Sequence, residues 1–352
     1  MKVVVVGAGY AGMLAANRIT KKVKTAEITV INPRPDFVER VRLHQQIAGT
    51  HVAATPLTSM LRDGITARVG TVEKIGDGCA TLDDGESLAF DYAFLAVGST
   101  VRPMPGTIPV GTWEGAEEAR TTLASLPPDS AVTVIGGGAT GIETAAELAE
   151  ARPDLRVRIV GPSVADNFSH RARARVRAEL RRLNVVIVDD GVTEVVDGVA
   201  RLRSGAAFAS DLTLWAIVAG VPDLAARSGL TVDTEGRALV DDCLRSVDDE
   251  RIFVVGDCAA VPGARFACAL AAPQAAHAAD TLARLIEGRA LEPYSLRYLG
   301  RAVTLGRKSA VAQFTHPDDT LRRTCLTGRT AVVLKELATR GGKYGARTGT
   351  GG

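Results

Sequence analysis

Two groups of three glycines are the residues of this 352-residue sequence whose spacing points most directly to chemistry. They form two copies of the pattern Gly-x-Gly-x-x-Gly: Gly7, Gly9 and Gly12; Gly136, Gly138 and Gly141. In such a pattern the first glycine permits a tight turn, the second lets the backbone approach a pyrophosphate, and the third allows close helix–strand packing. The free N–H groups and the dipole of the following helix favour bound phosphate. Each copy therefore predicts a dinucleotide site.

The elements that must position these glycines are a strand before each motif and a helix after it. A β-branched run precedes each copy and an alanine-rich stretch with good helix propensity follows it, at residues 2–6 and 13–19, then 131–135 and 142–149. A second apolar strand follows each helix, ending before Asn32 in one copy and Gly161 in the other, each 25 residues after the first motif glycine. The sequence therefore predicts an α/β fold with two doubly wound, Rossmann-type dinucleotide-binding domains.

Neither second strand ends in the Asp or Glu that usually binds the adenine ribose. Asn32 can still donate and accept through its amide, so ribose binding is expected there. Gly161 offers no side chain, and the nearest polar residues are Ser163, Arg171 and Arg173. Because no acid repels a 2′-phosphate, the sequence admits both NADH and NADPH.

The remaining chain divides into further predicted elements. Strand-like segments occupy residues 92–98, 212–220 and 252–257, and a helix is expected over 273–285. Prolines after residue 102 mark the exit from the first domain, into which the second is inserted. The predicted divisions are 1–108 and 239–293 for the first domain, 109–238 for the second, and 294–352 for a small C-terminal α+β appendage. Its glycine-rich end, from Arg340, is expected to fray.

Composition excludes several classes of function. The 42 Lys and Arg balance 40 Asp and Glu, for a net charge of +2, which favours no nucleic-acid partner. The content of 46% hydrophobic and 23% charged residues is ordinary for a globular protein, and no run approaches the ~20 apolar residues of a membrane helix. The five cysteines and five histidines show no metal-ligand spacing. A soluble, cytoplasmic protein without a metal site is expected, and a homodimer is left open.

Two segments have a structural and a functional interpretation. The arginine-rich stretch 170–183 places Val176, Leu180 and Leu183 on one face, which favours a solvated helix over a phosphate-binding patch. Asp257 ends a strand, where it could cap a turn or bind hydroxyls of a cofactor. For the adjacent Cys258, buried packing is favoured over redox chemistry because no second cysteine is near.

The order of four motifs resembles that of the FAD-dependent pyridine-nucleotide oxidoreductases without the redox disulfide. These motifs, within a resemblance that runs from residue 1 to about 335, are residues 7–12, 94–98, 136–143 and 256–260. The resemblance implies FAD in the N-terminal unit and NADH or NADPH in the inserted one. It assigns FAD contacts to Gly7, Gly9, Gly12, Asn32, Arg42, Val72, Gly98, Asp257 and Gln274. It assigns nicotinamide-dinucleotide contacts to Gly136, Gly138, Gly141, Glu143 and Gly220.

Within that family the resemblance also implies roles. Asp257 would bind the ribityl chain, Arg42 the FAD pyrophosphate, and Glu143 the nicotinamide carboxamide. The catalytic candidates are Gln274, Glu143 and His44. Gln274 lies in a segment, 271–277, that is similar to the helix start beside the flavin and quinone of type II NADH dehydrogenases, although Pro273 departs from that pattern.

The segment 36–46 has no cysteine, which excludes the disulfide, coenzyme A and peroxide reductases. What remains resembles type II NADH dehydrogenases and flavoproteins like apoptosis-inducing factor, without the terminal membrane-binding helices of the former. The expected function is an FAD-dependent NAD(P)H oxidoreductase that reduces a quinone-like or other small organic acceptor. The alternatives are a tailoring reductase acting on a biosynthetic intermediate and a redox-sensing flavoprotein with slow turnover.

Overall fold

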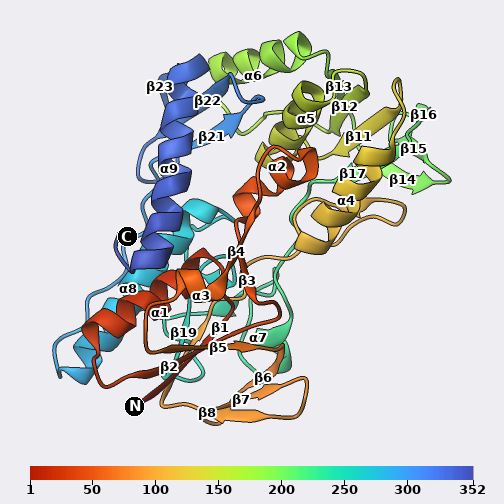
Figure 1. Ribbon diagram of the computed structural model, residues 1–352. Helices are drawn as coiled ribbons and strands as arrows, with labels where there is room; N and C mark the ends of the chain where they lie inside the picture. Colours follow the sequence, from red (N-terminus) through yellow and green to blue (C-terminus); the bar gives the residue numbers. More distant parts are fainter. Residues whose placement is uncertain (352) are drawn as a thin grey trace.

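Two five-stranded parallel sheets dominate the computed structural model, which describes residues 1–351 (Figure 1). The first has the order β19-β9-β1-β2-β5, with bounds β1 (Lys2–Val6), β2 (Glu27–Asn32), β5 (Ile65–Val69), β9 (Tyr92–Leu95) and β19 (Ile252–Val254). The second has the order β10-β17-β11-β12-β13, with bounds β10 (Ile108–Pro109), β11 (Ala131–Ile135), β12 (Arg156–Gly161), β13 (Val186–Asp189) and β17 (Leu212–Trp215). The predicted α/β fold with two doubly wound units is confirmed.

The central strands explain why both sheets are parallel and covered on both faces. Residues 3–6 of β1 and all residues of β11 are buried. Such continuous apolar strands require layers on both sides rather than one solvated face. The covering helices and shorter helical turns are α1 (Tyr10–Lys22), η1 (Arg40–Arg42), α2 (Leu43–Ala48), α3 (Leu57–Met60), α4 (Trp113–Ser125), α5 (Ala139–Ala151), α6 (His170–Arg182), α7 (Leu224–Arg227) and α8 (Cys268–Ile286).

The internal repeat extends further than the glycine motifs. Each unit also contains a three-stranded antiparallel sheet. Along the chain it lies between β5 and β9 in the first unit and between β13 and β17 in the second. These sheets are β6 (Val72–Gly76), β7 (Cys79–Leu82) and β8 (Ser87–Ala89), then β14 (Val192–Val196), β15 (Val199–Leu202) and β16 (Ala207–Ala209). Two short pairs complete the units: β3 (Asp36–Val38) with β4 (Ala54–Pro56), and β18 (Ala238–Leu239) with β20 (Ala259–Ala260).

Short segments on each side of the predicted boundaries at 108 and 238 pack into the core of the other unit. Leu43, Ile47 and Ala53 lie in the core of the second sheet although they precede residue 108. Val221 and Leu224 lie in the core of the first sheet although they precede residue 239. These apolar residues follow the nearest core rather than the order of the chain, and sequence composition does not reveal that choice.

The C-terminal region contains a third sheet and one long helix. The sheet consists of β21 (Gly300–Thr304), β22 (Ala310–Thr315) and β23 (Leu321–Thr327), and α9 (Gly328–Thr348) follows it. In Figure 1, α9 runs down one side of the molecule from this sheet to the neighbourhood of α1. Among the helices of residues 1–351, none is long and apolar enough to cross a membrane.

The expectation that the chain frays from Arg340 is wrong for the residues up to 351. Gly345 and Ala346 are buried, and Gly349 ends α9 in the left-handed conformation with φ +66°. A Cβ at Gly349 would lie 2.6 Å from the backbone nitrogen of Arg18, so the glycine permits close approach to α1. The Asn17 side chain donates to the Ala346 carbonyl (2.7 Å). Glycines that suggest flexibility in the sequence therefore serve helix packing here. Gly352 lies outside the described residues.

Candidate functional site

Both glycine motifs have the backbone geometry that a phosphate-binding turn requires. Gly7 and Gly136 adopt φ values of +102° and +133°, which side-chain-bearing residues rarely adopt. A Cβ at Gly12 would overlap the carbonyl oxygen of Gly7, and a Cβ at Gly141 would overlap that of Gly136. The first glycine therefore makes the turn and the third lets the helix pack against it.

Among the described residues, the helices that follow the motifs begin without a side-chain cap, as do α2, α3, α7, α8 and α9. Thr112 and Ser169 cap α4 and α6 by accepting from backbone N–H groups. Within residues 1–351 no side chain caps α1 or α5, and neither helix has an acid in its first turn. No described atom lies within 4 Å of a Cβ built at Gly9 or Gly138. Free N–H groups beneath open space fit the pyrophosphate of FAD or of a nicotinamide dinucleotide.

Asn32 bonds through its side chain to backbone atoms of the protein. Its Oδ1 accepts from the backbone nitrogen of Ala8 (3.1 Å), and its Nδ2 donates to the carbonyl of Arg34 (2.7 Å). The side chain is buried. Both ends of the amide thus fasten the first glycine loop to the end of β2, and the ribose contact expected of Asn32 stays a prediction.

Asp257 lies at the carboxyl edge of the first sheet with two donors on its carboxylate. Ser99 Oγ donates to Oδ2 (2.7 Å), and the backbone nitrogen of Ala267 donates to Oδ1 (3.1 Å). Arg40 Nη1 donates to the Ser99 carbonyl (2.9 Å) and lies 3.8 Å from a Cβ built at Gly98. The structure thus brings Gly98 and Asp257 together as the family resemblance implied. Sequence reasoning missed Arg40 and Ser99.

Arg42 does not lie free for a pyrophosphate. Its guanidinium is buried and donates to Glu39 (3.3 Å), Gln45 (3.1 Å) and Glu336 of α9 (2.8 Å). These acids keep Arg42 charged and raise its pKa against the opposing effect of burial. Arg42 is thus engaged by protein partners, and its contact with the FAD pyrophosphate stays a prediction. Arg40, two residues earlier, lies beside Ser99.

Gln274 also has an internal partner. Its Oε1 accepts from the backbone nitrogen of Gly256 (2.6 Å), and the side chain is 1% exposed. The helix begins at Cys268 rather than near Pro273, which lies inside it. Gln274 therefore lies further into α8 than expected and holds the Gly256–Asp257 turn. Its catalytic role stays a prediction.

Glu143 forms a buried ion pair that the sequence did not reveal. Its Oε1 accepts from the backbone nitrogen (2.9 Å) and the Oγ1 (3.0 Å) of Thr304, and Lys335 Nζ lies 3.1 Å away. Burial favours the neutral acid, but the Lys335 ammonium outweighs it and lowers the pKa of Glu143. Glu143 in turn raises the pKa of Lys335 despite burial. Both groups are therefore charged at neutral pH.

His44 lies near this ion pair on α2. It is buried, and its Nε2 has no hydrogen-bond partner among the described residues. Burial lowers the pKa of His44 to about 4, and the charge of Glu143 opposes that shift only in part. The imidazole is consequently neutral at pH 7, so it is no source of a proton there.

The two remaining predicted contacts lie at quite different places. Val72 begins β6 and is buried in the first core. Gly220 lies in a connection between the two units, where its φ is +78° and its carbonyl accepts from the backbone nitrogen of Thr100 (3.0 Å). Thr100 lies in the connection from the first unit to the second, and Gly220 lies in the connection back. The two connections are therefore hydrogen-bonded to each other.

The cysteines offer no dithiol. All five lie within the described residues and are free thiols. Burial raises the pKa of Cys258 to about 11, and its Sγ donates to the carbonyls of Leu95 and Val255 (3.4 Å each). Cys258 is thus a packed thiol, as expected. Residues 1–351 contain no group of three or more His, Cys, Asp or Glu side chains placed to hold a metal ion.

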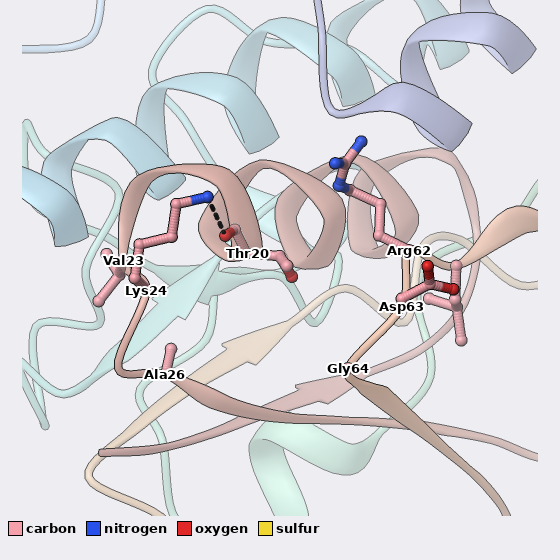
Figure 2. Close-up of a pocket in the computed structure, with 8 residues that line it drawn as sticks. Thr20, Val23, Lys24, Ala26, Arg62, Asp63 and Gly64 are labelled. Atoms are coloured by element: carbon pink, nitrogen blue, oxygen red, sulfur yellow. Dashed lines mark hydrogen bonds between the residues drawn. The ribbon is translucent and has the colours of Figure 1, made fainter.

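A surface pocket of about 530 Å³ lies at the amino edge of the first sheet, opposite the carboxyl edge that carries Asp257 (Figure 2). It is lined by the end of α1, with Thr20 and Val23, and by Arg62 to Gly64 before β5. In Figure 2 the Lys24 ammonium donates back to the Thr20 carbonyl at this helix end. Ligands of doubly wound sheets bind at the carboxyl ends of the strands, so this pocket is separate from the nucleotide sites.

Comparison with known proteins supplies the family. The model of the family described as pyridine nucleotide-disulphide oxidoreductase matches residues 1–281. The chain belongs to this family. NADH dehydrogenase-like protein YutJ of Bacillus subtilis is 26% identical, over 88% of this chain and 91% of its own length. An NADH dehydrogenase-like protein of Mycobacterium tuberculosis is 31% identical, over 74% of this chain and 73% of its own length.

A solved structure agrees in fold. NDH2 of Plasmodium falciparum in complex with NADH superposes with a TM-score of 0.81 at 15% identity, covering 98% of this chain and 97% of the other. The family uses FAD and NAD(P)H, and the paired glycine loops with open space above Gly9 and Gly138 fit both. The protein is therefore an oxidoreductase with these cofactors.

Proposed function

We propose that this oxidoreductase takes electrons from NADH or NADPH through FAD and passes them to a small organic acceptor of the quinone class. Relatives of similar sequence support the class of acceptor, since one is named a type II NADH:quinone oxidoreductase, from Haemophilus influenzae (26% identical over 53% of this chain). FAD, when bound, supplies the capacity to accept a hydride and to release electrons.

The observation that carries the proposal is the buried pair of Glu143 and Lys335. Glu143 projects from α5, which follows the second glycine motif, and Lys335 projects from α9. Reduction of a quinone to a hydroquinone consumes two protons with two electrons. Lys335 holds a proton on Nζ, and Glu143 keeps that ammonium charged in a largely desolvated place. Because Glu143 raises the pKa of Lys335 despite burial, the ammonium keeps its proton at neutral pH. Lys335 therefore fits the role of a fixed positive charge that stabilises a reduced, anionic acceptor, with both protons supplied by solvent.

The remaining residues bind and orient. The uncapped starts of α1 and α5 bind pyrophosphates, and the carboxylate of Asp257, held by Ser99, accepts hydroxyl hydrogen bonds of the flavin side chain. Gln274 and His44 shape the site without transferring protons at neutral pH.

The experiment separates flavin reduction from acceptor reduction. The FAD-loaded protein is reduced anaerobically with NADH or NADPH and then mixed with menadione in a stopped-flow instrument. Lys335→Met should slow the oxidative step at least about 10-fold, as expected for loss of a charge that stabilises the reduced acceptor, and should affect the reductive step less. Lys74→Met, at an exposed position of β6, is the control. Unchanged menadione reduction in Lys335→Met, or no flavin reduction in the unaltered protein, would contradict the proposal.

A further inference from the structure

β12 ends in a glycine, where enzymes that prefer NADH over NADPH usually have an acid. Gly161 holds the position where Asp or Glu binds both ribose hydroxyls. A Cβ at Gly161 would lie 2.6 Å from the backbone nitrogen of Gly137 in the second glycine motif. Any side chain there would displace the phosphate-binding loop. Recognition of the adenosine ribose must therefore come from the residues that follow.

The segment after Gly161 is held firmly against the glycine motif. The backbone nitrogen of Ala165 donates to the Gly137 carbonyl (2.9 Å), and that of Val164 donates to Asp189 Oδ1 at the end of β13 (3.0 Å). A Cβ at Gly137 would lie 3.0 Å from the Cα of Val164, which confirms the close approach. Ser163 is thus fixed beside the second glycine motif rather than carried on a free loop.

Arg173 reaches back from the first turn of α6 to this segment. Its Nε donates to the Val164 carbonyl (3.0 Å) and its Nη2 donates to Ser163 Oγ (2.9 Å). These bonds use one edge of the guanidinium, and the side chain remains 34% exposed. A hydroxyl and a guanidinium therefore lie together, in fixed orientation, next to the place where the acid is missing.

The positive charge of Arg173 is not neutralised by a close partner. The nearest acid is Asp189, whose oxygen lies 4.0 Å from Nη2. Asp189 is itself engaged by Arg177 through two bonds (2.8 and 2.6 Å), and that arginine lowers the pKa of Asp189. The three charged side chains leave one net positive charge beside Ser163.

We propose that Ser163 and Arg173 form a subsite for the 2′-phosphate of NADPH, so that NADPH is the preferred reductant. The proposal rests on the proposed function, because it concerns the nicotinamide nucleotide of that same site. A phosphate can accept from a hydroxyl and a guanidinium at once, and such charge-assisted bonds are the strong ones. The 2′-hydroxyl of NADH offers no charge to Arg173. The equivalent position in the first unit, Asn32, has no such arginine contact.

The test compares both nucleotides in matched variants of the FAD-loaded protein. We expect kcat/KM for NADPH to exceed that for NADH by roughly 10-fold or more, the scale of one charge-assisted hydrogen bond. Arg173→Ala should lower the NADPH to NADH ratio by a similar factor, and Ser163→Ala by less. Arg175→Ala is the control, because Arg175 lies on the same helix but pairs with Glu179 (3.6 Å). It should leave the ratio unchanged.

A binding measurement makes the outcome independent of turnover. Isothermal calorimetry should show that adenosine 2′,5′-bisphosphate binds at least about 10-fold more tightly than 5′-AMP, and that Arg173→Ala removes the difference. Circular dichroism confirms that each variant is folded. A preference for NADH, or equal binding of the two adenosine nucleotides, would overturn the subsite. If neither NADH nor NADPH reduces the flavin, the proposed function fails, while the calorimetry still decides the subsite.

Discussion

The two nucleotide-binding units share a backbone and differ in what surrounds it. In both, the third glycine lies against the first so closely that a single methyl group would not fit, and the helix begins uncapped. In the first unit, however, α1 packs against both α8 and α9, and Asn17 and Arg18 bond to the end of α9. In the second, α5 packs against α2 and β21, and the strand end is a glycine followed by the partly buried Arg173 and Arg177. The same phosphate cradle is thus built twice with different neighbours.

This difference separates a resident cofactor from an exchanging one. A dinucleotide held within packed helices dissociates slowly, because helices must move to release it, which suits FAD. We propose that a dinucleotide beside the partly exposed arginines of the second unit exchanges at each turnover, which suits NAD(P)H. The shared motif therefore determines that a pyrophosphate binds, and the neighbouring elements determine how long it stays.

The largest expected effect comes from filling the open space over each cradle. Gly9→Val should abolish FAD retention, weakening it by about 100-fold or more, and Gly138→Val should do the same for NAD(P)H. Both glycines have extended backbone, with φ of −79° and −83°, and no described atom near a built Cβ, so both variants should fold. Visible flavin absorbance of the purified protein measures the first effect, and the KM for NADPH the second.

The assignment of FAD to the first unit would be contradicted if purified Gly9→Val protein kept its full flavin absorbance. It would also be contradicted if Gly138→Val lost FAD while keeping its reduction by NADPH, because the two units would then hold the opposite nucleotides.

A smaller effect should appear in stability when the third glycine changes. Gly12→Ala and Gly141→Ala each place a methyl group against the carbonyl of the first motif glycine, which should cost about 2–3 kcal/mol of unfolding free energy. Because the local geometry is the same, the two losses should be similar. Gly9→Ala, where nothing is overlapped, is the control. Chemical denaturation of the apoprotein measures all three, and a loss in one unit alone would show that the cradles differ in packing.

His44 lies on α2, which packs in the second core, and it should make the free energy of unfolding depend on pH. Its pKa is about 4 in the folded protein and about 6.5 in an unfolded chain, so the unfolded state binds the proton first. Stability should therefore fall as the pH decreases from 6.5 to 4. His44→Gln should remove about 3 kcal/mol of that fall, as measured by urea unfolding at pH 7 and pH 4. Parallel pH profiles for the two proteins would show that His44 is not buried as described.

Glu336 should give the smallest effect, where α9 contacts the first unit. Arg42 and Arg340 outweigh burial and lower the pKa of Glu336 to about 2. A depressed carboxylate pKa stabilises the fold above the unfolded value near 4.5 and loses that contribution as the pH falls toward 2. Since the side chain is 29% exposed, Glu336→Gln should cost only about 1 kcal/mol at pH 7 and nothing near pH 2. Glu250→Gln, at an 81% exposed carboxylate, is the control and should show no such difference.

The sequence predicted what depends on neighbours along the chain and missed what depends on distant segments. The glycine loops, the strands around them and Asp257 follow from local patterns, and the structure places them as expected. The partner of Arg42, Glu336, was not foreseen because it lies in α9, 294 residues further along the chain. Lys335 was missed for the same reason, since the lysine becomes notable only when α9 brings it to Glu143. Asn32 and Gln274 were identified as important, but their partners are backbone atoms that a sequence does not display.

Anaerobic titration of the purified protein with NADPH tests the central claim most directly, since it requires both cradles to be filled and to face each other. The account predicts that the protein is isolated with one bound FAD, and that about one equivalent of NADPH bleaches its absorbance. Protein that binds no flavin, or bound flavin that keeps its colour in excess NADPH and in excess NADH, would contradict it.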